Sequence, residues 1–385
     1  MNEIYNRRLV VGIDAGGTRI RAALAAAEPG GALLGTGSGG PGNALGVGRA
    51  ELTAHLTDAL AQAVPPAARA RVGAVHGGFA GAAPGLGPDR GLDLVRTCLG
   101  DALAALGMAP AAVEIGGDTE VALAAAPGAP RDGLVLIAGT GAIAARVTAG
   151  ERALVADGHG WLLGDEGSGF WLGSQAVRAA LAALDGRGPA TSLVRAVLGH
   201  YGVPAASGPG VRPAGAAGSP PAAASGDSAL GAGIAYGGPG RPAAGARDLT
   251  VPVGPAPAGA GAAGPAWGAP GEPLAQAVAE GVVVRAYAAA PVELALLSPL
   301  VVAAAGEGDA VAAGLLARAA ELLAGTVRAL RPRAGEPLVL SGGLLGPGGP
   351  LVARVTELLA GTGVRVFPVS DGVVGAVALA RLLRS

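Results

Sequence analysis

The 385-residue chain is long enough for one large domain or two ordinary ones, each with its own core. It is 51% hydrophobic and only 3% aromatic, a composition that suits helices packed on sheets. The net charge is −1 and the 27 basic residues are scattered, which argues against a nucleic-acid-binding protein and favours small neutral or anionic ligands.

Cysteine content and hydropathy exclude several further classes of protein. Cys98 is the only cysteine, so an intrachain disulfide, a cysteine-clustered zinc site and a cysteine-ligated iron–sulfur cluster are excluded. The most apolar stretch, Leu294 to Gly306, contains Pro299 and is too short to span a bilayer. The first residues lack the apolar core of a signal peptide. These patterns predict a cytoplasmic protein with no membrane partner.

Residues 1 to about 200 alternate short β-branched runs with Ala- and Leu-rich helical segments, which predicts an α/β fold. LVVGIDAGGTRIRAALA (residues 9–25) predicts two strands joined by a turn, and LVLIAGTGAIAARV (residues 134–147) repeats this form. Two similar hairpins in the two halves of the chain indicate a duplicated domain. The residues at the two tips are Asp14, Gly16, Gly17 and Thr18 in the first hairpin, and Gly139, Thr140 and Gly141 in the second.

Glycine turns of this kind expose successive backbone N–H groups and let an anion approach, as in a phosphate-binding nest. Asp14 beside such a nest would repel a phosphate unless a divalent cation lay between them, and Mg²⁺ bound through waters and phosphate oxygens supplies that bridge. A single turn of this kind is most simply a β-hairpin turn. Several at strand ends favour phosphate binding, because ligands of open α/β sheets bind at the carboxyl ends of strands.

Two common nucleotide motifs are excluded. A P-loop needs a lysine, and the chain has none. A dinucleotide fold needs G-x-G-x-x-G leading into a helix, whereas both glycine turns here lead into strands.

Further along the chain, DGHGWLLGDEGSGFWLG (residues 157–173) gathers acids, a histidine and aromatic side chains around glycines. Residues 203–271 are nearly all Ala, Gly, Pro and Ser, which predicts a disordered insertion. Helical patterns then return, one of them starting after a cap at Asp309. A strand runs into Ser341-Gly342-Gly343, and a helix, a strand and a last helix follow.

Five segments carry a family resemblance: GIDAGGTRIRAAL, GDTEVALAAA, LIAGTGAIA, GHGWLLGDEGSGFWLG and LVLSGGLL. They resemble the N-acetylglucosamine kinase group of the BadF/BadG/BcrA/BcrD ATPase family, within the actin, hexokinase and heat-shock-chaperone fold. The resemblance covers residues 9–383 apart from the low-complexity insertion. It implies a duplicated RNase H-like, two-lobe fold. The expected lobes are residues 1–115 with 372–385, and residues 116–371.

The resemblance also implies an ATP-dependent kinase that transfers phosphate to the C6 hydroxyl of an amino sugar, foremost N-acetylglucosamine, with ATP and Mg²⁺ as cofactors and a homodimer as a possible assembly. The nucleotide would be held by Asp14, Gly16, Gly17, Thr18, Gly139, Thr140, Gly141, Ser341, Gly342 and Gly343, with Asp14 organising the Mg²⁺ through water. The sugar would be contacted by Asn43, Asp118, Gly160, Trp161 and Asp165.

Asp118 would be the catalytic base, although the sequence around it suits a helix N-cap equally well. Trp161 could form a pocket wall or belong to the core, and His159 a polar pocket residue or a structural one. Two departures from the family remove a hydroxyl each: Ile20 stands where a second Thr is common, and Ala142 where Ser is common. Weaker nucleotide binding is one possible result.

Other functions stay open at this point. An activator ATPase of the 2-hydroxyacyl-CoA dehydratase type needs cysteines for its iron–sulfur cluster, and a glucokinase of the repressor/kinase group carries a cysteine-rich zinc motif; one cysteine supports neither. A BadF/BadG-type ATPase, or a sugar or nucleotide sensor without catalysis, is the alternative function.

Overall fold

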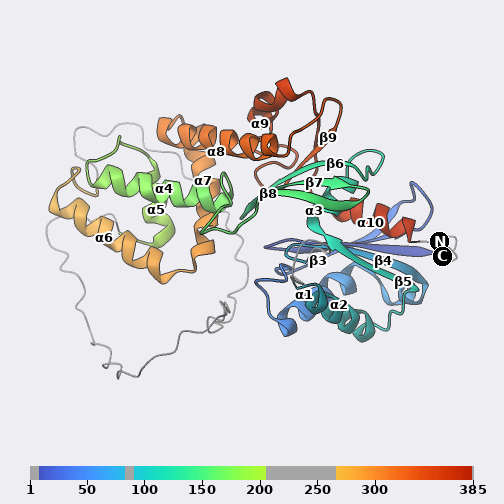
Figure 1. The fold of residues 1–385 in the computed structure, drawn as a ribbon. Coiled ribbons are helices and arrows are strands. Elements are labelled where there is room, and N and C mark those ends of the chain that lie inside the picture. The colour runs from blue at the N-terminus through green and yellow to red at the C-terminus, as the bar shows by residue number, and fades with distance from the viewer. Residues whose placement is uncertain (1–7, 83–90, 205–265, 384–385) are drawn as a thin grey trace, which may run out of the picture.

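The computed structural model describes residues 8–82, 91–204 and 266–383, and these residues form two five-stranded sheets (Figure 1). The first sheet has the order β3-β2-β1-β4-β5, with β1 antiparallel to β2 and parallel to β4. Its strands are β1 (Leu9–Ala15), β2 (Ile20–Ala26), β3 (Leu33–Gly39), β4 (Val72–Phe79) and β5 (Ala112–Gly117).

The second sheet repeats this arrangement. Its order is β10-β9-β6-β7-β8, so β6, β7 and β8 correspond to β1, β2 and β3, while β9 and β10 correspond to β4 and β5. The strand directions match as well, antiparallel along β6-β7-β8 and parallel along β6-β9-β10. The strands are β6 (Gly133–Ala138), β7 (Ala142–Thr148), β8 (Glu151–Asp157), β9 (Pro337–Ser341) and β10 (Arg365–Pro368). The predicted duplicated two-lobe fold is confirmed.

Each sheet is covered by helices on both faces, which explains why central strands such as β1 are apolar on both sides. Beneath the first sheet lie α1 (Arg49–Ala63), η2 (Pro66–Arg71) and α2 (Leu92–Ala105). Two further helices, α3 (Asp118–Ala124) and α10 (Val373–Leu382), lie between the sheets (Figure 1). Helix α10 packs on the first sheet and α3 on the second, and the two helices pack on each other.

The remaining helices belong to the C-terminal half. Four of the elements form a cluster with its own core, on the left of Figure 1: α4 (Gly169–Leu184), α5 (Leu193–Tyr201), α6 (Pro273–Ala288) and η3 (Pro291–Leu297). The others are α7 (Ser298–Gly306), α8 (Ala310–Ala329), α9 (Val352–Leu359) and η4 (Ala360–Thr362).

The predicted disordered insertion lies mostly outside the described residues. Its two ends, however, are described and packed. Val203 is buried in the core of the α4–α6 cluster, and Trp267 packs against the same core. The boundaries predicted at residues 203 and 271 therefore took in ordered chain, because a single large apolar side chain in an Ala- and Gly-rich text is a weak signal. The predicted lobe limits at residues 115/116 and 371/372 stay a prediction.

Helix α8 is N-capped by Asp309, as predicted, through a bond of 2.9 Å from the Ala312 N–H. Among the described residues it is the one helix with the length and apolar composition to cross a membrane. Its inner face, including Ala319 and Leu323, is fully buried in the core of the second lobe, as in a core helix.

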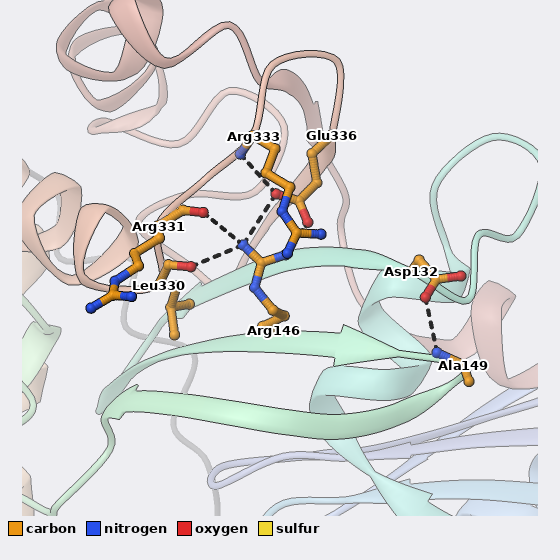
Figure 2. A network of polar contacts seen from close by, with 7 residues as sticks. All are labelled: Asp132, Arg146, Ala149, Leu330, Arg331, Arg333 and Glu336. Carbon is orange, nitrogen blue, oxygen red and sulfur yellow. Dashed lines mark hydrogen bonds and ion pairs between the residues drawn. The ribbon is translucent and has the colours of Figure 1, made fainter.

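The C-terminal end of α8 is fastened to the second sheet by Arg146 of β7 (Figure 2). This buried guanidinium forms an ion pair with Glu336 and donates to the carbonyls of Leu330 and Arg331 at 2.9 and 3.0 Å. A buried cation needs such a full set of acceptors, because an unpaired one would carry a large desolvation cost.

Helix α10 approaches α3 and β1 so closely that a side chain at either of two glycines would overlap the neighbouring backbone. A Cβ on Gly375 would overlap the carbonyl oxygen of Val121 in α3, and one on Gly12 of β1 would overlap the backbone nitrogen of Val377 in α10. Both obstacles are backbone atoms, which cannot move aside as the end of a side chain can. The layer of α3 and α10 between the sheets therefore depends on these glycines.

We predict that Gly375→Ala destabilises the protein by about 1–3 kcal/mol, the usual cost of overpacking a tight contact. The matched control is Gly314→Ala in α8, where an added Cβ meets nothing within 4 Å. That variant should gain about 0.5–1 kcal/mol, because alanine is the better helix former. Denaturant unfolding of both variants measures this, and equal effects would contradict the inferred contact.

Candidate active site

The two predicted hairpins are present, β1–β2 in the first sheet and β6–β7 in the second. The first turn is closed by the Gly16 N–H bonded to the Arg19 carbonyl at 3.0 Å, and the second by the Gly139 N–H bonded to the Gly141 carbonyl at 2.9 Å. Neither Gly17 nor Gly139 has a positive φ angle, and a Cβ on either would meet nothing within 4 Å. Backbone strain and internal packing thus give no reason for glycine at these two positions.

Asp14 lies near the end of β1, and its Oδ2 accepts a 2.9 Å hydrogen bond from the Gly372 N–H at the start of α10. Burial raises the pKa of Asp14 to about 6; the Gly372 N–H lowers it, the Asp371 charge raises it and Arg21 lowers it. Asp371 in turn lies 3.4 Å from the guanidinium of Arg21. At neutral pH the Asp14 carboxyl is mainly ionised but poorly solvated, which favours a cation nearby.

Asp118 is the first residue of α3, and the N-cap position belongs to Gly117. The alternative role predicted from sequence, an N-cap at Asp118, is therefore wrong by one residue. Burial raises the pKa of Asp118 to about 7, with further raising by Asp14 and Glu120. Arg152 of β8 and the N–H of Thr119 act in the opposite direction. The fold thus keeps two partly desolvated carboxyl groups, from β1 and α3, within each other's electrostatic field.

Asp165 lies against the second hairpin. Its Oδ1 accepts a 3.3 Å hydrogen bond from the Ala142 N–H, and a Cβ on Gly141 would come within 2.8 Å of its Oδ2. Burial raises the pKa of Asp165, partly offset by the Ala142 N–H. The sequence predicted a contact with sugar hydroxyls, and the structure adds a contact that the sequence did not predict.

The segment after Asp165 also holds the second hairpin. The N–H groups of Gly169 and Phe170, at the start of α4, donate to the carbonyls of Gly139 and Thr140 at 2.8 and 3.0 Å. The GDEGSG block and the second glycine turn are therefore one structural unit.

Gly160 and Trp161 lie in the loop between β8 and α4. The Trp161 side chain is 39% exposed, and its ring lies 5.6 Å from that of Phe170. Of the two possibilities left open by the sequence, a core position for Trp161 is wrong.

Asn43 lies beside the first hairpin. Its Oδ1 accepts the Leu45 N–H at 2.9 Å, and the neighbouring Gly42 N–H donates to the Gly16 carbonyl at 2.9 Å. The loop that carries Asn43 is thus joined to the first glycine turn.

The third predicted loop joins the second hairpin. β9 ends at Ser341, and Gly342 has a φ of +94°, a conformation that favours glycine. The Leu344 N–H donates to the Ala138 carbonyl at 3.1 Å, directly before the second turn. Ser341, Gly342 and Gly343 therefore border Gly139.

Sequence reasoning missed several groups around the two carboxylates: Arg21, Glu120, Arg152, Asp371 and Gly372. The Asp-Gly pair before the last helix was the one local signal, since it marks a turn or helix start.

The apolar residues at positions 20 and 142, where the family commonly has a hydroxyl, also have a structural explanation. The side chains of Ile20 and Ala142 are both buried in the cores of their lobes. In the described part of the chain, no group of three or more His, Cys, Asp or Glu side chains is arranged to hold a metal ion.

The BadF/BadG/BcrA/BcrD ATPase family matches the chain over residues 11–380. The chain belongs to this family. Over 81 residues, this family member is 40% identical to the N-acetylmuramic acid/N-acetylglucosamine kinase of Clostridium acetobutylicum. That stretch covers 21% of this chain and 26% of the relative, so the match spans about a quarter of the curated protein's length.

Two solved structures are similar over nearly their whole length. The first, described as a candidate N-acetylglucosamine kinase of Chromobacterium violaceum, is 24% identical with a TM-score of 0.59, and the match covers 97% of this chain and 99% of that one. The second, described in the same way from Porphyromonas gingivalis, is 17% identical with a TM-score of 0.59 and the same coverage. These similarities confirm the two-lobe fold of this BadF/BadG/BcrA/BcrD family member.

The raised pKa of Asp118 predicts how the stability of this family member depends on pH. Between the unfolded pKa near 3.8 and the folded pKa of about 7, the unfolded chain has released a proton that the native Asp118 still holds. Stability therefore falls as pH rises through this range, and Asp118→Asn removes the loss. Its gain over wild type, from denaturant unfolding, should be about 2–3 kcal/mol larger at pH 8 than at pH 5.

The control for a lost negative charge is Asp58→Asn, on the exposed side of α1. It should show no comparable pH-dependent gain. A constant difference between Asp118→Asn and wild type across this pH range would refute the inferred ionisation.

Proposed function

We propose that the chain is an ATP-dependent sugar kinase that phosphorylates the C6 hydroxyl of an amino sugar, with N-acetylglucosamine as the first substrate to test. The observation that carries this proposal is the buried Asp118 carboxyl at the start of α3, with a pKa of about 7 and within the electrostatic field of Asp14 of the first hairpin. A general base works best when its pKa lies near the working pH. The family membership and the partial match to an amino-sugar kinase support the same activity.

In this proposal ATP lies between the two glycine turns. Gly17 and Gly139 have neither backbone strain nor crowding to explain them, and the close approach of a phosphate supplies the reason. Ser341, Gly342 and Gly343 would face the adenosine. Thr18 and Thr140 would add hydroxyl donors, and the sugar would lie against Asn43, Gly160, Trp161 and Asp165.

Asp14 suits a Mg²⁺ ion held through water. Protein Mg²⁺ sites commonly use one or two carboxylates together with waters and substrate phosphates, so the lack of a three-residue cluster among the described residues fits this ion. The Asp14 carboxyl is desolvated and has another carboxylate, Asp371, in its field, which a cation would relieve. Bound Mg²⁺ would offset the charge of the phosphate oxygens.

Asp118 would then accept the proton of the sugar C6 hydroxyl while that oxygen attacks the γ-phosphorus of ATP in line. The bond from the γ-phosphorus to the β,γ-bridging oxygen breaks, and ADP and the sugar 6-phosphate form. The other contributions are positioning and charge neutralisation, which phosphoryl transfer chiefly requires.

The family description itself names ATPases, so ATP hydrolysis without a sugar acceptor, or binding without turnover, is the second candidate. ADP release measured with and without amino sugars separates these functions. Release that depends on the sugar supports the kinase, and equal release with and without sugar supports the ATPase. The expected homodimer stays a prediction.

For the kinase, we predict that Asp118→Asn lowers kcat by roughly 10²- to 10⁴-fold, the usual effect of removing a general base. An amide can still bond the sugar hydroxyl, so the KM for the sugar should change less. The wild-type kcat/KM should rise with pH and level off above an apparent pKa near 7, as the folded pKa of about 7 implies. An Asp118→Asn enzyme with near-normal turnover would remove Asp118 from the mechanism.

For the metal, we predict that Asp14→Asn raises the Mg²⁺ concentration needed for half-maximal turnover, because an amide holds a hydrated cation poorly. The Asn side chain still has an oxygen for the Gly372 N–H, so the start of α10 should stay in place. Sugar affinity, measured by calorimetry without ATP, should change little. Unaltered turnover at limiting Mg²⁺ would show that Asp14 has another role.

A further inference from the structure

Asp157, the last residue of β8, joins the two ends of a loop. The loop carries Gly160 and Trp161, which the proposed function assigns to the sugar site, but Asp157 itself has no role in that proposal. Its Oδ1 accepts the Asp165 N–H at 2.8 Å, and its Oδ2 accepts the Glu166 N–H at 2.9 Å. One carboxylate thus joins the two ends of residues 158–164, here called the closing loop. Hydrogen bonds to an ionised acceptor are stronger than neutral ones, which suits a group that must fix a loop.

The ends of the closing loop have an uncommon backbone conformation. Asp157 has a φ of +63° and Asp165 a φ of +57°, both in the left-handed region that non-glycine residues seldom adopt. Gly164 packs directly against the carboxylate, since a Cβ there would overlap Asp157 Oδ1. Such conformations persist where surrounding contacts enforce them, and here the carboxylate supplies those contacts.

Core packing does not account for the shape of the closing loop. Its three large apolar side chains are exposed: Trp161 by 39%, Leu162 by 67% and Leu163 by 78%. Its geometry is therefore set by hydrogen bonds rather than by buried side chains: the Leu163 and Gly164 N–H groups donate to the Gly160 carbonyl inside the loop, and Asp157 joins its ends. Its far end delivers Asp165, whose carboxylate lies on the second hairpin at the Ala142 N–H.

We propose that Asp157 is a positioning residue for the sugar side of the active site. It holds the closing loop and Asp165 in the place where the sugar binds. This inference rests on the proposed kinase function.

The nucleotide side should depend on Asp157 less than the sugar side does, although Asp165 also contacts the second hairpin at the Ala142 N–H. The Gly169 and Phe170 N–H groups hold the second hairpin through its carbonyls, and α4, which carries them, has its own cap: Ser168 Oγ accepts the Trp171 N–H at 3.1 Å. Loss of the Asp157 carboxylate should thus raise the sugar KM more than the ATP KM. General destabilisation would instead lower the active fraction, and hence kcat, without this selectivity.

Two substitutions test the proposal at graded strength. Asp157→Asn tolerates the left-handed backbone and keeps one acceptor for the two N–H groups. Asp157→Gly also fits the backbone but removes both bonds. We expect the sugar KM to rise roughly tenfold in Asp157→Asn and further in Asp157→Gly, with the ATP KM within about twofold of wild type.

Asp132 provides the matched control. Its Oδ1 accepts the Ala149 N–H at 3.0 Å at the turn between β7 and β8, the opposite end of the same strand pair (Figure 2). Asp132→Asn makes the same chemical change to the same kind of bond, far from the hairpin tip. It should leave both KM values unchanged.

Hydrogen exchange supplies a readout that needs no activity. The amides of Asp165 and Glu166 should exchange faster in both Asp157 variants, while the amides of Gly169 and Phe170 and the whole loop in Asp132→Asn stay at the wild-type rate. Thermal melts confirm that the variants are folded, and Asp157→Asn suffices should Asp157→Gly fail to fold.

The outcomes are distinct. A wild-type enzyme that phosphorylates no amino sugar overturns the proposed function and this role with it. An active wild type whose sugar KM is unchanged in Asp157→Asn, or whose ATP KM rises equally, overturns the positioning role alone. A selective rise in sugar KM together with faster exchange at Asp165 and Glu166 supports it.

Discussion

The close contact of α10 with α3 and β1 is the constraint on which the rest of the structure depends. Gly375 and Gly12 let three backbones approach to a distance that no Cβ would allow. Because α10 packs on the first sheet and α3 on the second, this contact sets the relation between the two lobes. It also brings the Gly372 N–H to the Asp14 carboxylate, so the same packing that joins the lobes shapes the candidate active site.

The electrostatics of the site follow from that packing. Asp14 and Asp118 belong to different elements, and both carboxyl groups are buried. This burial removes water from around them and raises both pKa values. An arrangement of this kind lowers the stability of the empty protein at neutral pH. Such a cost is typical of functional sites, where charged groups are held ready for a ligand rather than for one another.

Local sequence patterns predicted the parts of the fold that depend on local chemistry. The two hairpins followed from strand patterns around glycine turns, the duplication from their similarity, and the α8 cap from Asp309. The placement of Asp14 and Asp118 at strand and helix ends was also predictable. The functional roles of these residues remain proposals, since they came from a family resemblance rather than from geometry.

The contacts that tune the site could not be predicted, because they join distant parts of the chain. The bond from Gly372 to Asp14 spans 358 residues, and no local pattern at either end announces it. The Asp157 carboxylate accepts bonds from residues close in sequence, Asp165 and Glu166. These bonds depend on a left-handed backbone at Asp157, which an aspartate in the sequence does not by itself predict. The exact start of α3 was not predictable either: the N-cap is Gly117, one residue before the Asp118 position that the sequence suited.

The contribution of α10 to the first sheet has a consequence for biosynthesis. One face of that sheet, with Val10, Ala23 and Ala74, is covered by residues of α10 that the ribosome makes more than 350 residues after β1, as the span of the Gly372–Asp14 bond shows. Domains generally fold as units during synthesis, the N-terminal one first. Here the first lobe must keep an apolar surface uncovered until residues 373–382 emerge. The first lobe can therefore reach its native packing only near the end of translation.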